Sequence, residues 1–253
     1  MRKLFILLVL ATTLFGVPTN KYIPTKAYPL LPVVYENVDE LFVDFEMKSY
    51  FPALFEQESC IALTYKRCWS PTSRLYATRK NGTREEGAGM PQLTRVWRRN
   101  GTVRFDTLTL LTRKYPKELA GLTWKTVYKR PKLQLKAGML LWRDNYLRLG
   151  RNYPKMTTLS KIAMADAAYN GGYGGLRKEI RACSRKKGCN PMKWFGHVEK
   201  TCMKSKRALY GRRNACDINR EHVRTIFFKR YYKYYVQDEL TRKILEASEK
   251  HNH

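Results

Sequence analysis

The sequence predicts a mainly α-helical protein with a small irregular or β-hairpin insertion. Apolar residues recur at helical spacing through most of the chain. Residues 60–86 are instead rich in turn-forming and basic residues, which is typical of an insertion between helices. Hydrophobic residues make up 43% of the 253 positions and aromatic residues 13%, enough to bury a core. We therefore expect one α-rich domain, without internal repeats.

The N-terminal end resembles a secretory signal. Arg2 and Lys3 precede an apolar run at residues 4–10, and weaker hydrophobicity continues to residue 17. The run is shorter than a bilayer span and no good cleavage site follows it. Residues 1–17 are thus expected to be a signal peptide or a weak membrane anchor, and residues 18–32, which are rich in proline, a linker. A cytosolic protein that buries this segment as a strand is the alternative.

Most of the expected helices have a recognisable start signal. Ser49 can cap a first turn, Asp106 can cap another, and Pro131 and Pro191 suit the first turn of a helix. In chain order, helices are expected at residues 33–47, 49–60, 106–115, 131–150 and 160–168, from residue 190, and from residue 219 as a long basic helix.

Glu58 is the first candidate for chemistry. Phe51, Leu54 and Phe55 form an apolar stripe at helical spacing, and Glu58 follows at the end of that segment. A carboxyl group in such a place is partly desolvated, which favours its protonated form and suits a general acid. A solvated carboxylate at a helix end would give the same pattern.

A glycine-rich stretch, residues 87–93, follows the expected insertion. Gly87 and Gly89 let the backbone pass close to a ligand, and Gln92 offers an amide donor and acceptor for sugar hydroxyl groups. A glycine turn before a helix would look the same.

The six cysteines agree with export. Their short separations favour the pairs Cys60–Cys68, Cys183–Cys189 and Cys202–Cys216, although six cysteines allow fifteen connectivities. No pair has Cys-x-x-Cys spacing, and His197 stands alone on an apolar-looking segment, so neither a metal site nor a cofactor is expected.

The net charge of +28, from 49 Lys and Arg against 21 Asp and Glu, indicates an anionic partner such as nucleic acid, lipid or a cell-wall polymer. The aromatic and basic run at residues 227–235 could stack on bases, but no nucleic-acid-binding motif accompanies it. We therefore expect tyrosines packed on the core and no specific nucleic acid. A basic, non-catalytic binding protein remains an alternative.

Three short motifs stand in a fixed order. Glu58 and Ser59 end the first helix, Gly89 to Gln92 form the glycine stretch, and Ala168, Tyr169 and Asn170 end a small-residue helix. Together they resemble the catalytic domain of soluble lytic transglycosylases, which is related to goose-type lysozyme. The resemblance covers residues 33–175; the remainder is similar to extensions in phage-type cell-wall lysis proteins.

The resemblance implies a lysozyme-like domain at residues 33–182, with a cysteine-containing basic helical extension at 183–253 packed on it. It implies cleavage of peptidoglycan glycan strands by an exported monomer that is periplasmic or bound to the anionic envelope. Glu58 would be the single acid and base. The substrate-binding residues would be Ser59, which orients the substrate or the carboxyl group, Gly89, Met90 and Gln92 of the groove, Tyr169, which bonds Glu58, and Asn170.

Two departures from the family pattern keep an alternative open. Pro91 lacks the N–H group that the family has at this position. The segment before Gly89 is long and contains Glu85 and Glu86, either of which could serve as a second carboxylate of a hydrolytic muramidase. A solvated loop pair is the other interpretation of these two glutamates.

Overall fold

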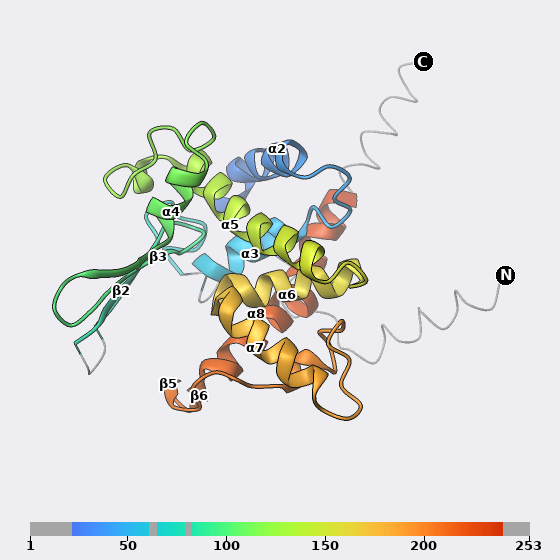
Figure 1. Ribbon diagram of the computed structural model, residues 1–253. Coiled ribbons are helices and arrows are strands. Elements are labelled where there is room, and N and C mark those ends of the chain that lie inside the picture. Colours follow the sequence, from blue (N-terminus) through green and yellow to red (C-terminus); the bar gives the residue numbers. More distant parts are fainter. Residues whose placement is uncertain (1–21, 61–64, 79–81, 240–253) are drawn as a thin grey trace, which may run out of the picture.

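The computed structural model describes residues 22–60, 65–78 and 82–239. The expected signal segment at residues 1–17 and the end of the charged tail lie outside the described residues. The described chain is mainly α-helical with a small antiparallel sheet, which confirms the predicted fold class at this level (Figure 1). The helical elements are η1 (Thr25–Leu30), α2 (Leu31–Leu41), α3 (Tyr50–Ser59), α4 (Thr107–Lys114), η2 (Val127–Lys129), α5 (Pro131–Asn152), α6 (Thr158–Gly171), α7 (Tyr173–Ser184), η3 (Val198–Lys200), α8 (Ala215–Thr225), the π-helical turn η4 (Ile226–Arg230) and residues 231–239.

Helix α3 lies at the centre of the molecule, between α5, α6 and the C-terminal helical segment (Figure 1). Its apolar stripe is fully buried, as the sequence predicts. Trp142 of α5 lies against the rings of Tyr50 and Phe51, with centroids 5.2 Å apart in both pairs. Aromatic pairs at this spacing add to the stabilisation from apolar burial, so this contact fixes α3 on α5.

The insertion forms a four-stranded antiparallel meander, in place of an irregular segment or a single hairpin. Its strands, in spatial and chain order, are β1 (Arg74–Thr78), β2 (Arg84–Ala88), β3 (Leu93–Trp97) and β4 (Val103–Asp106). A second, two-stranded sheet joins β5 (Ala208–Tyr210) to β6 (Arg213–Asn214). The meander extends past residue 86, so the glycine stretch connects two paired strands.

Start signals were predicted well for two helices. Pro131 begins α5, and Asp106 caps α4 by accepting a hydrogen bond from Thr109 N at 2.9 Å. The cap of α6, Thr157, was not predicted, and this helix begins two residues before the expected start at residue 160. Ser49 does not cap α3: its backbone is already helical, and its hydroxyl donates to Asp238 instead.

The first predicted helix was too long. α2 ends at Leu41 because Phe42 is extended, and Asp44 then adopts a left-handed backbone with φ of 53°. The expected linker is also partly structured, since η1 fills its second half and Pro32 lies in the first turn of α2.

The helix predicted from Asn190 does not form. The Asn190 side chain accepts from Met192 N at 2.8 Å in a local turn, and Gly196 has a φ of +78°. Helix α7 was not predicted, and it crosses the expected boundary at residue 183. The basic helix begins at Ala215, earlier than predicted, because Asn214 and Asp217 form a capping box.

The C-terminal helical segment returns to the start of the chain. Asp238 accepts hydrogen bonds from the hydroxyl groups of Tyr35 and Ser49, and Arg230 donates to Gln57 and to the carbonyl oxygen of Cys60. The C-terminal segment therefore contacts the chain at both ends of α3.

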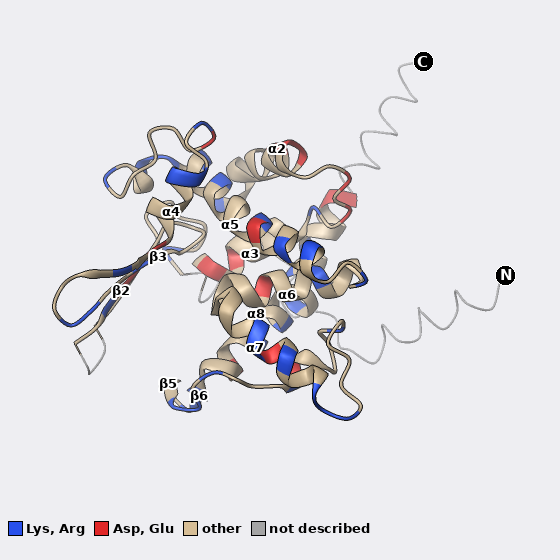
Figure 2. Cartoon of the chain, viewed as in Figure 1, with Lys and Arg blue, Asp and Glu red and all other residues tan. Residues whose placement is uncertain are grey.

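All three predicted disulfides form: Cys60–Cys68, Cys183–Cys189 and Cys202–Cys216. Such bonds persist in oxidising compartments, which supports export. Among the described helices, none is long and apolar enough to cross a membrane. Lys and Arg are spread over most elements (Figure 2), whereas five acidic residues in the described part of the chain are buried: Glu56, Glu86, Asp166, Glu179 and Glu199.

Candidate functional site

Glu58 lies in the last turn of the buried helix α3, and its side chain keeps 13% exposure. The imidazole Nε2 of His222, on α8, lies 2.8 Å from its Oε1. Among the described residues, none gives Oε2 a hydrogen bond. Glu58 is therefore a carboxyl group held through one oxygen at the edge of the core.

His222 continues into a second buried contact. Its Nδ1 lies 3.0 Å from Oδ2 of Asp166, on α6, and Oδ1 of Asp166 accepts a hydrogen bond of 2.6 Å from the Tyr50 hydroxyl. Asp166 has no exposed surface, and His222 is buried. Three helices thus meet in a chain of hydrogen bonds, Tyr50–Asp166–His222–Glu58.

The charges in this series of hydrogen-bonded residues determine the protonation state of His222. Burial disfavours the charged imidazole, but Asp166 and then Glu58 outweigh it and raise the pKa of His222 to about 10. Burial, followed by the charge of Asp166 and its hydrogen bond, raises the pKa of Tyr50 well above its usual range. At neutral pH both ring nitrogens of His222 therefore donate, and the neighbour of Glu58 is a cation rather than the apolar setting that the sequence predicted.

Tyr169 lies one turn after Asp166 on α6. Burial raises its pKa well above the usual range, with further contributions from the charges of Glu58 and Asp166. Its hydroxyl donates to the carbonyl oxygen of Pro91 at 2.6 Å, so the predicted hydrogen bond to Glu58 is wrong. His222 holds Glu58 instead, and Tyr169 joins α6 to the glycine turn.

The glycine turn depends on its backbone. Gly89 has a φ of +71°, and a Cβ atom there would lie 2.3 Å from Oε1 of Gln134. That oxygen accepts from Met90 N at 3.1 Å, and the Met90 side chain is fully buried. Only glycine fits at position 89, and Gly89 and Met90 shape the turn from inside.

Gln92 turns inward. Its Nε2 donates to the carbonyl oxygen of Gly89 at 2.7 Å and to Ser73 Oγ at 3.2 Å. Its backbone is left-handed, with φ of 48°, and Gly87 makes room for its Oε1. The amide donors expected to face sugar hydroxyl groups instead brace the turn.

Pro91 packs against two helices. A Cβ atom on Gly138 of α5 would lie 2.6 Å from Pro91 Cβ and 2.9 Å from Phe55 Cε1 of α3. Glycine at 138 therefore lets the turn approach both helices closely. Although Pro91 has no N–H group, its carbonyl oxygen and its ring tie the turn to the core.

Ser59 and Asn170 have structural partners. The Ser59 hydroxyl donates to Phe55 O at 2.7 Å and accepts from Trp69 N at 3.1 Å, instead of orienting the Glu58 carboxyl group. Asn170 is exposed and accepts from Asn219 Nδ2 at 3.0 Å.

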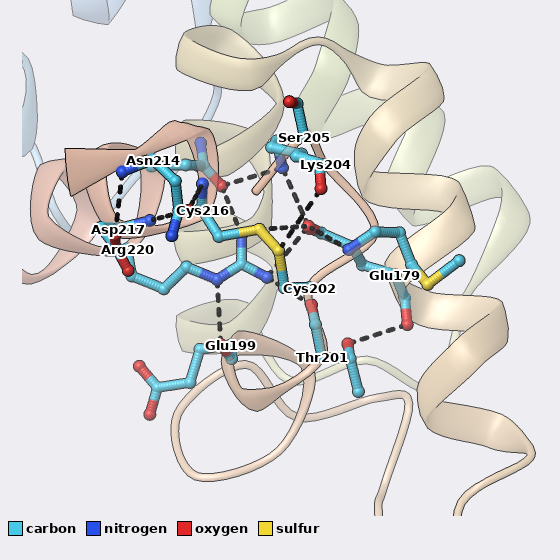
Figure 3. The surroundings of a disulfide bond; sticks show 12 residues. Glu179, Glu199, Thr201, Cys202, Lys204, Ser205, Asn214, Cys216, Asp217 and Arg220 are labelled. Atoms are coloured by element: carbon cyan, nitrogen blue, oxygen red, sulfur yellow. Dashed lines mark hydrogen bonds and ion pairs between the residues drawn. A yellow bond between two sulfur atoms is a disulfide. The ribbon is translucent and has the colours of Figure 1, made fainter. Parts of the chain in front are cut away.

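Asn219 links Asn170 to a buried charge cluster beside the Cys202–Cys216 disulfide (Figure 3). Glu179, which is fully buried, has Lys204 Nζ at 3.1 Å and Arg220 Nη2 at 3.0 Å. Lys204 also donates to Asn219 Oδ1 at 3.2 Å. This cluster fixes the start of α8, the helix that carries His222.

The second-carboxylate candidates lie in strand β2, so the expectation of a solvated loop is wrong. Glu86 is buried and accepts from Arg74, Arg95 and Tyr128 at 2.8, 3.1 and 2.9 Å. Glu85 is half-buried on the opposite face of the strand. Glu86 is thus committed to the fold of the sheet.

The sequence interpretation missed Tyr50, Gln134, Asp166 and His222. The best signal was Asp166, a single carboxylate among the alanines of a small-residue helix, since a buried charge needs a partner. Nothing in the sequence named that partner. Within the described residues, no group of three or more His, Cys, Asp or Glu side chains could hold a metal ion.

Comparison of the chain with protein-family models, curated proteins and solved structures finds no match. The assignment of function therefore depends on the motifs and on the geometry around Glu58.

Proposed function

We propose that the protein is a peptidoglycan lytic transglycosylase with a lysozyme-like fold, in which Glu58 is the single general acid and base. One observation carries the proposal: Glu58 ends a buried helix, is held through one oxygen, and has no hydrogen bond to Oε2 from any described residue. A fixed, partly exposed carboxyl group of this kind can pass a proton in both directions.

The order of the elements around Glu58 supports the same proposed function. The Glu58 helix is followed by an antiparallel sheet, in which the glycine turn between β2 and β3 lies near Phe55 and Gly138, and then by Tyr169 near the end of α6. These elements follow the order of the three motifs that resemble the family.

The reaction requires two proton transfers at Oε2. Glu58 first gives its proton to the oxygen of the bond between N-acetylmuramic acid and N-acetylglucosamine, and the C–O bond breaks towards an oxocarbenium-like sugar. The carboxylate then takes the proton of the C6 hydroxyl group of the same muramic residue. That oxygen bonds to the anomeric carbon, an intramolecular step. The product is a 1,6-anhydro end, and no water is consumed.

A hydrolytic muramidase is the second candidate. It would need a carboxylate to activate water, and the three hydrogen bonds to Glu86 disfavour that residue. The basic binding protein is disfavoured because Tyr234 of the aromatic run is buried and bonded to Glu56, although Phe228, Tyr232 and Tyr235 remain exposed.

We expect Glu58→Gln to abolish cell-wall cleavage in zymograms while leaving the fold and wall binding unchanged. Glutamine keeps an Oε1 acceptor for His222 but cannot transfer a proton. General acid–base catalysis contributes about 10²- to 10⁴-fold, and the loss of both steps should reach the upper part of this range. Glu46→Gln, in an exposed turn, is the matched control and should remain active.

The product distinguishes the two enzymatic candidates. Mass spectrometry of muropeptides released by the unmodified protein should show anhydro-muramic ends, lighter by one water than reducing ends. Ends that borohydride reduces would assign a hydrolase. Absence of cleavage by the unmodified protein, or full activity of Glu58→Gln, would refute the assignment of Glu58.

A further inference from the structure

We propose that His222 is a positioning residue that holds the Glu58 carboxyl group through Oε1, so that Oε2 is the atom that exchanges protons with the glycan. This inference rests on the function proposed for Glu58. It adds a residue that none of the three motifs contains, and that lies 164 positions further along the chain.

The geometry restricts the imidazole ring on both sides. Nε2 is 2.8 Å from Glu58 Oε1, and Nδ1 is 3.0 Å from Asp166 Oδ2. A ring bonded at both nitrogens cannot rotate without breaking a buried contact, which is costly in the protein interior. Its position therefore sets the position of the Glu58 carboxyl group.

Asp166 is itself immobilised. Its second oxygen accepts a hydrogen bond from the Tyr50 hydroxyl group, and its helix, α6, packs against both α5 and α8. Tyr50 is fully buried against Trp142. Tyr50, Asp166 and His222 are joined in series by hydrogen bonds. The packing of the core therefore sets the position of the His222 ring.

The groups that act on His222 come from two other helices, Glu58 on α3 and Asp166 on α6. Tyr50 bonds Asp166, and Tyr169 lies within reach of the charges of both carboxylates. On α8 itself, Arg220 is paired with Glu179, as is Lys204 from the segment before the helix. The two carboxylates raise the pKa of His222 to about 10, so the ring remains an imidazolium through the neutral range. A charged donor forms a stronger and more directional hydrogen bond to a carboxylate than a neutral one.

This arrangement supports the first half of the proposed reaction, because a cation stabilises the carboxylate form of Glu58, and the proton that returns in the second half does so against that charge. When Oε2–H gives its proton to the glycosidic oxygen, the carboxylate that forms is already bonded to a cation. When Oε2 accepts the proton of the C6 hydroxyl group, Glu58 returns to its starting state. His222 keeps both of its protons throughout, so protons balance between Glu58 and the glycan alone.

Kinetics on soluble, uncross-linked glycan strands test the role. His222→Gln should lower kcat on the order of a hundredfold with little change in KM, because misplacement of a reacting group by about 1 Å has an effect of this size. His197→Gln is the matched control, since His197 accepts a hydrogen bond from Asn190 N and makes no contact with Glu58. An unchanged kcat in a folded His222→Gln protein would overturn the proposal, as would a change confined to KM.

NMR of the protein with ¹⁵N-labelled histidine tests the contact without requiring activity. In the unmodified protein the His222 ring should titrate near pH 10, and in Glu58→Gln and Asp166→Asn at clearly lower pH. Titration of the unmodified protein near pH 6.5 would overturn the proposal even if His222→Gln failed to fold. A titration near pH 10 in a protein that cleaves no peptidoglycan would instead refute the proposed function and leave the contact intact.

Discussion

Two glutamates on one helix have opposite roles because they face different partners. Glu58 keeps partial exposure and a single hydrogen-bond partner among the described residues. Glu56 is fully buried and is bonded by Arg230, by Lys233 at 2.7 Å and by Tyr234 at 2.6 Å. Removal of one partner from such a buried group is strongly destabilising, so Glu56→Gln is unsuitable as a control for Glu58.

His222 should also make the stability of the protein depend on pH. Its pKa is about 10 in the folded protein and about 6.5 when unperturbed. The folded protein binds the proton more tightly, so the stabilisation is complete below about pH 6.5 and is lost as the pH rises towards 10. Because one pKa unit corresponds to about 1.4 kcal/mol, the effect can reach several kcal/mol.

Denaturant unfolding of the unmodified protein and His222→Gln at several pH values checks this expectation. Burial lowers the pKa of Lys204 and Lys233, which adds a trend of the opposite sign, but this trend is common to both proteins. The stability advantage of the unmodified protein should shrink between pH 6.5 and 10. A constant advantage would contradict the charged state of the ring.

At the scale of elements, α8 is the helix on which the site depends most. It begins at a capping box, carries Cys216 of a disulfide, and presents His222 two turns later. The Cys183–Cys189 disulfide instead closes a short loop at the end of α7. The two bonds therefore offer a matched pair of perturbations.

We expect loss of the Cys202–Cys216 bond, by substitution of both cysteines with serine, to lower cleavage as well as stability. Its 14-residue separation implies a stabilisation of about 3 kcal/mol, and the six-residue separation of Cys183–Cys189 about 2.4 kcal/mol. Only the first change should reduce cleavage well below the unfolding temperature, because it frees the start of α8. Equal activity losses in the two variants would show a global effect.

Whether a feature of the fold or site could be predicted from the sequence depends on how far apart along the chain the interacting residues lie. The buried face of α3, the cap of α4, the start of α5 and the three short-range disulfides follow from residues close in sequence. The Tyr169–Pro91 and Glu58–His222 contacts join residues 78 and 164 positions apart, and no local pattern specifies them. The motifs do lie near one another, since Tyr169 bonds Pro91 and is reached by the charge of Glu58, but the partners of each residue depend on tertiary packing.

At the scale of the whole molecule, several acidic side chains are buried in the interior instead of lying on the surface. Glu56, Glu86 and Glu179 each pair with at least one buried or half-buried cation. Lys and Arg are spread over most of the described elements (Figure 2), and under the proposed function the net charge of +28 suits binding to an anionic wall.

Wall binding should therefore weaken as salt concentration rises, since exposed charges are screened over about 8 Å at physiological ionic strength. Sedimentation of Glu58→Gln with purified sacculi measures binding without cleavage. Binding that is equally tight at low and high salt would rule out an electrostatic mode.

The contacts between α3 and the C-terminal segment have a consequence for the order of synthesis. The partners of Glu56 and Glu58 lie at residues 222–234, and those of Tyr35 and Ser49 at residue 238. Chains are made from the N-terminus at about 5–20 residues per second, so α3 emerges well before any of these groups. A growing chain has Glu58 but not the imidazole that holds it. Under the proposed function, cell-wall cleavage begins only when the last helix has been made and has packed against α3.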